Sequence, residues 1–232
     1  GIIFDLRGNG GGSLPAAVGI AGHFIDQGPV VQVKTQGQRV RSYDDPTPGV
    51  VWDGPLVVLV DESTASASEI VAAALQDYGR AVVVGSKQTF GKGTVQTFRP
   101  LGNDAGVKIT TARYYTPNGR SIQAKGILPD VLLDETENGN VFAALRTREA
   151  DLEKHLGNGQ EAEKKNEERQ KAREEALKKL EADAKKPESE RRPPEFGSAK
   201  DFQLNQALNQ LKGLPVKVSA TLAERKVEKK DK

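Results

Sequence analysis

Leu56-Val57-Val58-Leu59-Val60-Asp61-Glu62-Ser63-Thr64-Ala65-Ser66 opens the part of the sequence that decides the fold. Its first five residues are continuously apolar, which is typical of a strand covered on both faces. The segment from Ser66 to Asp77 has the composition of a helix, and a second apolar run, Ala81-Val82-Val83-Val84, follows the turn at Gly79. Strand, helix and strand in this order predict a largely parallel sheet with right-handed crossovers.

Further segments extend this unit on either side. Upstream, Ile2-Ile3-Phe4-Asp5-Leu6 is a short apolar strand, and a glycine turn follows at residues 8–12. A helix is expected from Leu14, because the proline after it is tolerated in a first turn and apolar residues recur at helical spacing. Downstream, residues 107–115 alternate and are rich in β-branched side chains, which predicts a strand. We therefore expect residues 1–135 to form an α/β unit.

The bulk composition excludes several classes of protein. The 232 residues carry 34 basic and 32 acidic side chains, so no global basic field argues for a nucleic-acid partner. The absence of cysteine excludes disulfides, thiolate metal sites and a cysteine nucleophile. The two histidines lack metal-ligand spacing, and we expect neither a metal nor a cofactor. No stretch approaches the roughly 18 apolar residues of a membrane span.

The composition changes near residue 135, which suggests three regions. Residues 136–198 are dense in Glu, Lys, Arg and Ala, and we interpret them as a charged helical linker or arm, with a long solvated helix over 163–184. In the last region, residues 199–232, Asp201 is expected to cap an amphipathic helix, and a short helix is expected over 221–230. The chain starts abruptly on a strand, so we expect the upstream part of the first region to be missing.

Ser66 is the candidate nucleophile. It follows a buried strand and opens a helix, which places its side chain at the carboxyl edge of the sheet, where open α/β folds have their sites. The backbone N–H of Ala67 then lies at the helix start, aimed where an oxyanion forms. The alternative is structural, because Ser66-Ala67-Ser68-Glu69 is a capping box by pattern and the hydroxyl could simply satisfy helix N–H groups.

Lys92 is the candidate base, because a serine needs a group that removes its proton. A lysine can do this when a dry pocket keeps its amine neutral, although most lysines are solvated. The glycines on both sides of Lys92 allow close approach to another segment. Gln96 faces the same side of a strand and could orient the amine, and Asp77 could add polar support, unless it is an ordinary helix-terminal carboxylate.

The glycine turn allows two interpretations. Strand, glycines and helix resemble a dinucleotide-binding motif, but Ser13 stands where its third glycine is required. The sequence around Lys92 resembles the end of a phosphate loop, but it has Gly93 where that pattern requires Ser or Thr. The same turn could supply backbone N–H donors, and we assign the second oxyanion donor to Gly11.

Four motifs in order resemble the carboxyl-terminal processing peptidases, also called tail-specific proteases. They are the strand and glycine turn at 5–12, the serine segment at 63–70, the lysine segment at 89–96 and the closing segment at 115–131. The resemblance implies a crotonase/ClpP-like protease core with a mixed, largely parallel sheet, of which residues 1–135 are the C-terminal part. It implies Ser66 as nucleophile, Lys92 as base and Gln96 as orienting residue. The family's PDZ domain would precede residue 1.

The resemblance also implies a function and a location. We expect a serine endopeptidase that cleaves proteins recognised by apolar C-terminal tails, with an adaptor or activator protein as a further partner. The long, Gram-negative members of the family imply a periplasmic location, with association with the inner membrane as a further expectation. Two alternatives stay open, namely a crotonase-like acyl-CoA enzyme, and a non-catalytic adaptor that binds a partner through its helical tail.

Overall fold

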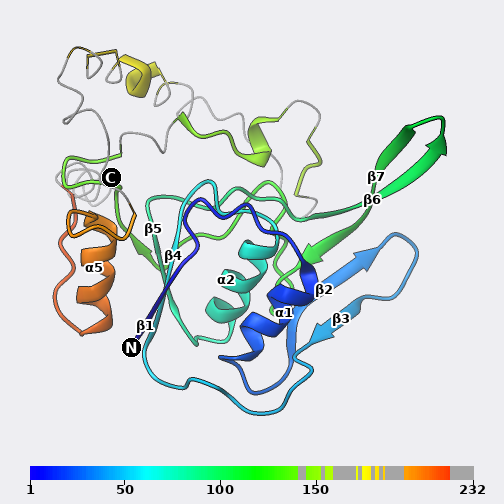
Figure 1. Ribbon diagram of the computed structural model, residues 1–232, viewed down its shortest axis with the longest axis horizontal. Helices are drawn as coiled ribbons and strands as arrows, with labels where there is room; N and C mark the ends of the chain where they lie inside the picture. The colour runs from blue at the N-terminus through cyan, green and yellow to red at the C-terminus, as the bar shows by residue number, and fades with distance from the viewer. Residues whose placement is uncertain are drawn as a thin grey trace, which may run out of the picture.

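The computed structural model describes residues 1–140, 145–152, 155–158, 171, 174–178, 181–182, 185 and 196–219. Within this part of the chain, two four-stranded sheets and the helices packed on them form the fold (Figure 1). The predicted α/β class is confirmed. The single mixed sheet that we expected is instead divided into one parallel and one antiparallel sheet.

The parallel sheet has the strand order β1-β4-β5-β8. It contains the predicted strands at Ile2–Asp5 (β1), Leu56–Val60 (β4) and Val82–Gly85 (β5), and a short strand at Val131–Leu132 (β8). All three pairings are parallel. The carboxyl ends of β1 and β4 therefore lie together at one edge, and both the glycine turn and the Ser66 segment leave the sheet there.

Helices cover both faces of this sheet because its central strand is apolar on both sides. Leu56, Val58 and Val60 share a buried cluster with helices α1 (Leu14–Gly22) and α2 (Ala67–Asp77). Val57 and Leu59 face the other way and pack with helix α5 (Phe202–Leu211). The predicted helix after Asp201 thus forms, and its apolar face covers the second face of the parallel sheet (Figure 1).

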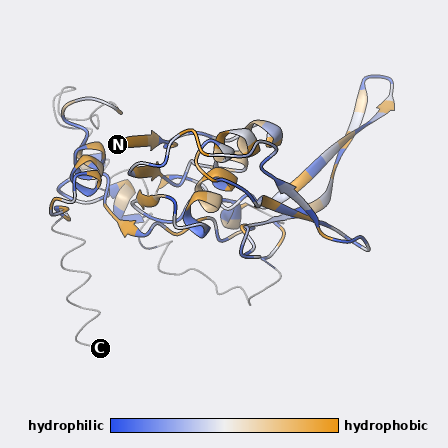
Figure 2. Cartoon of the chain, turned by 90° about the horizontal axis from the view of Figure 1, so that it is seen from below, coloured by the Kyte–Doolittle hydropathy of each residue, from blue (hydrophilic) through white to orange (hydrophobic). Residues whose placement is uncertain are grey.

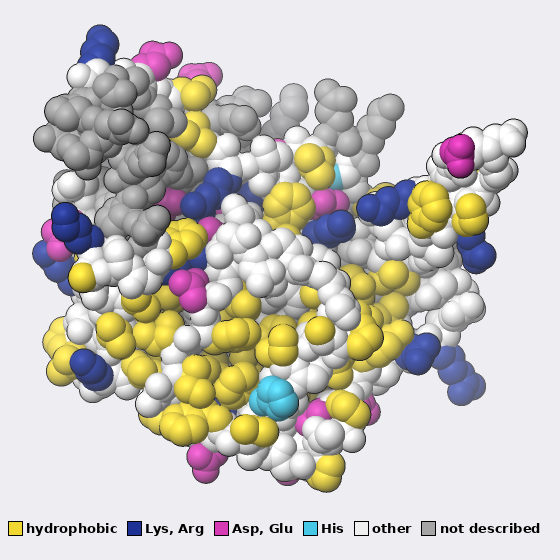
Figure 3. Space-filling view, viewed as in Figure 1, with side chains coloured by type: hydrophobic (Ala, Val, Ile, Leu, Met, Phe, Trp, Pro, Cys, Tyr) yellow, Lys and Arg dark blue, Asp and Glu magenta, His cyan; other side chains and the backbone are white. Residues whose placement is uncertain are grey.

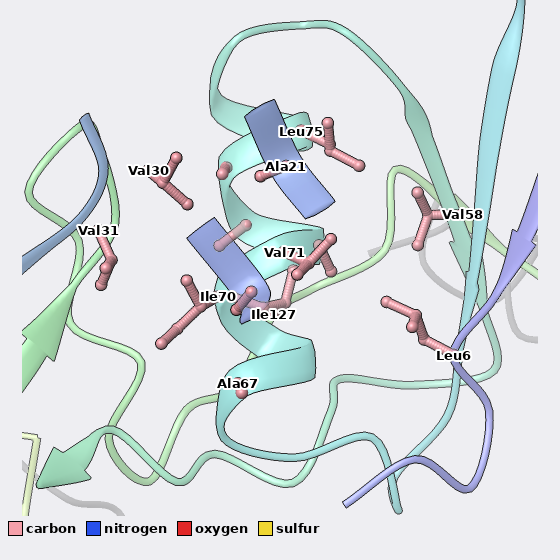
Figure 4. Packing of buried hydrophobic residues seen from close by; sticks show 14 of the residues in the cluster. Leu6, Ala21, Val30, Val31, Val58, Ala67, Ile70, Val71, Leu75 and Ile127 are labelled. Carbon is pink, nitrogen blue, oxygen red and sulfur yellow. The ribbon is translucent and has the colours of Figure 1, made fainter. Parts of the chain in front are cut away.

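The antiparallel sheet has the order β3-β2-β7-β6. Its strands are Pro29–Thr35 (β2), Arg41–Asp44 (β3), Thr94–Gly102 (β6) and Ala105–Tyr115 (β7), the last of which confirms the strand predicted at 107–115. Helix α2 lies between the two sheets, with Val30 and Val31 on one side and Leu6 and Val58 on the other (Figure 4).

Both hairpins of this sheet project from the body of the molecule (Figures 1 and 2). Lys and Arg side chains stand out along them in the space-filling view (Figure 3). Because β6 begins just after residue 92, the hairpin β6–β7 is continuous with the lysine segment.

The predictions for the charged region are largely untested. The helix expected over 163–184 lies mostly, and the one over 221–230 entirely, outside the described residues. A 3₁₀ turn at Glu149–Asp151 lies upstream of it. In the portion of the chain that the structure describes, none of the helices combines the length and apolar character needed to cross a membrane.

Candidate active site

Ser66 occupies a strained turn between β4 and α2. Its backbone angles are φ 56° and ψ −117°, a region that non-glycine residues rarely adopt. Its side chain makes no capping hydrogen bond to the helix. Both reciprocal contacts of the predicted capping box between Ser66 and Glu69 are present, but of the two only the backbone N–H of Ser66, which donates to the Glu69 carboxylate at 2.8 Å, makes a hydrogen bond. The half-buried Ser66 side chain therefore approaches the start of the helix without a hydrogen bond to it, and the strained turn holds it at the sheet edge.

Glu69 joins the serine segment to the lysine segment. Its carboxylate is fully buried, and one oxygen, Oε2, accepts the backbone N–H of Ser66 at 2.8 Å and that of Lys92 at 2.9 Å. The other oxygen accepts the Gly91 N–H at 2.7 Å and the Thr89 hydroxyl. Burial raises the pKa of the Glu69 carboxyl, and these four donors oppose that shift by stabilising the charged form. One buried side chain thus sets the distance between the backbones of the candidate nucleophile and base.

Lys92 lies on a closely packed loop, as its flanking glycines predicted. A Cβ at Gly93 would come within 2.3 Å of the Gln123 backbone nitrogen, and one at Gly91 within 3.1 Å of the backbone of residue 124. The Gly93 N–H donates to the Gln123 side chain at 2.9 Å, which fixes the loop on the closing segment. The Lys92 side chain is half-buried, and among the described residues the one hydrogen bond that Lys92 makes outside regular secondary structure is that of its backbone N–H to Glu69, not one from its amine to Ser66. Hydrogen bonds between catalytic groups commonly tighten only when substrate binds.

Among the described residues, neither Gln96 nor Asp77 makes a hydrogen bond to Ser66 or Lys92. Gln96 is exposed on β6, next to a register shift between Val95 and Gln96, and among the described residues it makes no hydrogen bond to Lys92. Its orienting role stays a prediction. Asp77 is the last residue of α2, about 15 Å along the helix axis from Ser66. There it pairs with Arg120 and accepts the Asn118 N–H at 2.9 Å, so it anchors a turn rather than the site.

The glycine turn lies directly against the serine segment. A Cβ at Gly11, where φ is +88°, would come within 2.7 Å of the Ala67 nitrogen and 3.0 Å of the Ser66 Cβ. The backbones of Gly11 and Ala67, whose N–H groups are predicted as oxyanion donors, are thereby packed closely against each other. In this structure the Gly11 N–H donates to the Asn9 side-chain oxygen at 2.9 Å, so an oxyanion must displace that amide oxygen.

Two further contacts hold the glycine turn and the serine segment together. Asp61, the residue after β4, accepts the N–H groups of Gly8 at 3.0 Å and Thr64 at 2.9 Å with the same oxygen. The Ala65 N–H donates to the Asn9 carbonyl at 2.9 Å. The two turns therefore form one hydrogen-bonded unit at the carboxyl edge of the parallel sheet.

Sequence reasoning missed the role of Glu69 and of Asn9. Glu69 was recognised only as part of a capping box, although a glutamate on the wholly apolar side of a helix signals a buried acceptor. Asn9 was treated as one member of a glycine-rich turn. No local pattern identifies which distant backbone groups these side chains bind.

A strained serine after a buried parallel strand, packed against a glycine turn, defines a class of α/β proteins with a nucleophile-type site at the sheet edge. Residues 1–133 match peptidase family S41, and the chain belongs to this family. The family resemblance that the four motifs predicted is thus confirmed.

Individual relatives agree with this assignment. The carboxy-terminal-processing protease of Bartonella bacilliformis is 40% identical over 167 residues, which cover 71% of this chain and 38% of that protein. The tail-specific protease of Haemophilus influenzae is 43% identical over 150 residues, or 60% of this chain and 21% of that protein. Among solved structures, the photosystem II D1 C-terminal processing protease matches with a TM-score of 0.52 at 43% identity, covering 58% of this chain and 34% of that one. This chain spans well under half the length of each.

Proposed function

We propose that this chain carries the catalytic dyad of a serine endopeptidase, with Ser66 as nucleophile and Lys92 as general base. The observation that supports this most is the shared Glu69 oxygen, which lies within 3 Å of the backbone nitrogens of both residues. A structural role for Ser66 alone would not require its backbone to be tied to a lysine 26 positions away. The strained turn at Ser66, whose side chain makes no hydrogen bond to the helix it precedes, supports the same conclusion.

The proposed reaction proceeds through an acyl-enzyme. The Lys92 amine, acting as general base, accepts the Ser66 hydroxyl proton, and the serine oxygen attacks the scissile carbonyl carbon. The N–H groups of Ala67 and Gly11 hold the oxyanion, and each such donor typically contributes about 100- to 1000-fold in rate. When the C–N bond breaks, the Lys92 ammonium gives its proton to the leaving amine. Water then attacks the ester, Lys92 takes a proton from it, and that proton returns to the Ser66 oxygen as the bond to the acyl group breaks.

We also propose that the substrates are proteins recognised by their C-terminal tails. This proposal is supported by the names of the similar proteins from Bartonella bacilliformis and Haemophilus influenzae. The periplasmic location and the adaptor partner remain predictions from the resemblance.

The proposal is tested by a peptide-cleavage assay. The assay uses a form of the protein that has the full length of its relatives. Ser66→Ala and Lys92→Ala are expected to abolish cleavage of a model substrate with an apolar C-terminal tail, with little change in melting temperature. Ser63→Ala and Lys87→Ala are matched controls from the same two loops, and both should retain activity. Full activity in either of the first two variants refutes the dyad. Tight binding of an acyl-CoA without cleavage would favour the crotonase-like alternative, and partner capture without any turnover would favour the adaptor.

A further inference from the structure

Arg7 is a buried cation between β1 and the glycine turn, and the mechanism above does not use it. Its side chain is 1% exposed. Asp5, two residues earlier, accepts from the guanidinium at 2.7 Å and 3.0 Å. An arginine has five N–H donors in a rigid fork, and a fully buried guanidinium requires acceptors for all of them. Asp5 supplies only part of that set.

The remaining acceptors come from helix α5, at the other end of the chain. Asp201 binds the guanidinium with both carboxylate oxygens, at 3.0 Å and 2.6 Å, although it lies 194 residues away in the sequence. The Gln203 side-chain oxygen accepts at 3.2 Å, and the Phe196 ring lies 4.1 Å from the guanidinium carbon. Every guanidinium N–H of Arg7 therefore has an acceptor, which indicates a specific interaction rather than a chance contact.

Asp201 is itself firmly held. It is the N-cap of α5, where it accepts the Leu204 N–H at 3.0 Å, and it also accepts the Gly197 N–H at 2.9 Å. Its side chain is 4% exposed. Burial raises the pKa of the Asp201 carboxyl, but the Arg7 hydrogen bonds and the two backbone donors outweigh it and hold that pKa below its usual value. The pair stays charged at neutral pH.

From Arg7 a continuous path of contacts leads to the candidate oxyanion donor. The next residue, Gly8, donates its N–H to Asp61, which also holds the serine segment. Asn9 then binds both the serine segment and the Gly11 N–H. Any displacement of Arg7 is therefore transmitted through a two-residue backbone link to the turn that contacts Ser66. Replacing a buried ion pair by apolar groups often costs no stability, so stability alone does not explain why one is present here.

We propose that Asp201 is a positioning residue, which acts through Arg7 to fix the glycine turn against Ser66. Helix α5 is then part of the catalytic unit, although sequence analysis placed it in a separate C-terminal region. This inference rests on the proposed function, since it assigns the glycine turn to the oxyanion site.

The test measures acylation of Ser66 by a fluorophosphonate probe in the 232-residue chain, with the maximal rate of inactivation separated from probe affinity. Asp201→Asn keeps the helix cap, because asparagine is a good N-cap residue, but it presents an N–H₂ group toward the Arg7 donors. Leu204→Ala is the matched control, because it removes an apolar contact of α5 and leaves the ion pair intact. Gln203→Met removes one acceptor of Arg7, and with it the Gln203 hydrogen bond to the Leu133 carbonyl, without changing charge, and it provides a second variant should Asp201→Asn fail to fold.

Asp201→Asn is expected to lower the maximal rate about 10- to 100-fold, the range that a displacement near 1 Å produces, with probe affinity almost unchanged. Gln203→Met should give a smaller loss, and Leu204→Ala should lower the melting temperature while the folded protein keeps its rate within about twofold of wild type. If the folded Asp201 and Gln203 variants react as fast as the Leu204 variant, the positioning role is wrong and the dyad stands. If wild type gives no adduct at Ser66, the proposed function fails first.

Discussion

Replacing Glu69 by glutamine perturbs the contact that links the serine and lysine segments. The carboxylate accepts four hydrogen bonds, three of them from backbone N–H groups. A glutamine retains one acceptor oxygen, so its N–H₂ group must face two of these donors. Losing two charge-assisted hydrogen bonds lowers the free energy of unfolding by about 3–6 kcal/mol. Because a neutral side chain costs less to bury than a carboxylate, part of this is recovered, and we expect the free energy of unfolding to fall by about 2–4 kcal/mol. For a chain of this size this corresponds to a fall of roughly 5–15 °C in melting temperature.

Activity should fall further than stability explains. When Oε2 no longer holds both backbones, the Ser66 hydroxyl and the Lys92 amine lose their relative placement, and acylation of the folded protein should slow about 100-fold. The measurements are thermal unfolding and the rate of probe acylation at a temperature where the variant is folded.

Glu62→Gln is the control, because Glu62 is also buried but, within the described residues, its Oε1 has no hydrogen-bond partner, and its Oε2 has only long contacts, with the Ser86 hydroxyl at 3.4 Å and Arg146 at 3.5 Å. That variant should be no less stable than wild type. Equal losses of stability in the two variants, or a folded Glu69→Gln protein with the wild-type rate, would contradict the role we assign to Glu69.

Three other predictions follow from the same contacts. Gly11→Ala should abolish acylation and destabilise the protein by at least about 2 kcal/mol, because Gly11 has a positive φ and its position, 2.7 Å from the Ala67 nitrogen for an added Cβ, excludes a side chain. Gly10→Ala is the control and should be tolerated, because a Cβ there meets no atom within 4 Å. Equal effects of the two variants on acylation would count against this geometry. Burial raises the pKa of Glu62, so its contribution to stability is present at acid pH and lost as pH rises through the folded-state pKa. Unfolding measured across pH should therefore show Glu62→Gln gaining stability relative to wild type at pH 7 but not near pH 4. The pKa of Asp201 is lowered, so the contribution of its carboxylate to the free energy of unfolding is present above about pH 4 and lost as pH falls below it. Chemical unfolding should therefore show a steeper loss of stability at acid pH in wild type than in Asp201→Asn. Parallel stability curves for the two proteins would argue against the Arg7 ion pair.

The parallel sheet and its two first helices could be predicted because each is encoded locally. The run Leu56–Val60 is apolar at every position, and the helix that follows it begins at the predicted serine. The positions of Ser66 and Gly11 also followed from local order, since both leave parallel strands at the same edge. The antiparallel sheet was predicted only in part. In β2, Val31 and Val33 alternate with polar residues, a strand signal that the sequence analysis passed over.

The contacts that shape the site could not be predicted because they join distant segments. Nothing near Arg7 in the sequence indicates a partner 194 residues away, and the pattern around Glu69 is fully explained by an ordinary capping box. Asp77 shows the converse case, in which the place in the fold was recognised and the partner was not. Its position at a helix end was correctly recognised, but the length of that helix separates it from Ser66, and only the tertiary structure shows that Arg120 is its partner.

The most direct test of the dyad is chemical rescue of Lys92→Ala, followed by intact mass and peptide mapping of the fluorophosphonate adduct. We predict that wild type and Lys87→Ala acquire one adduct at Ser66, that Lys92→Ala loses it, and that added ethylamine restores part of the rate in Lys92→Ala alone. Labelling of Lys92→Ala at the wild-type rate without amine, or an adduct at a residue other than Ser66, would contradict the account.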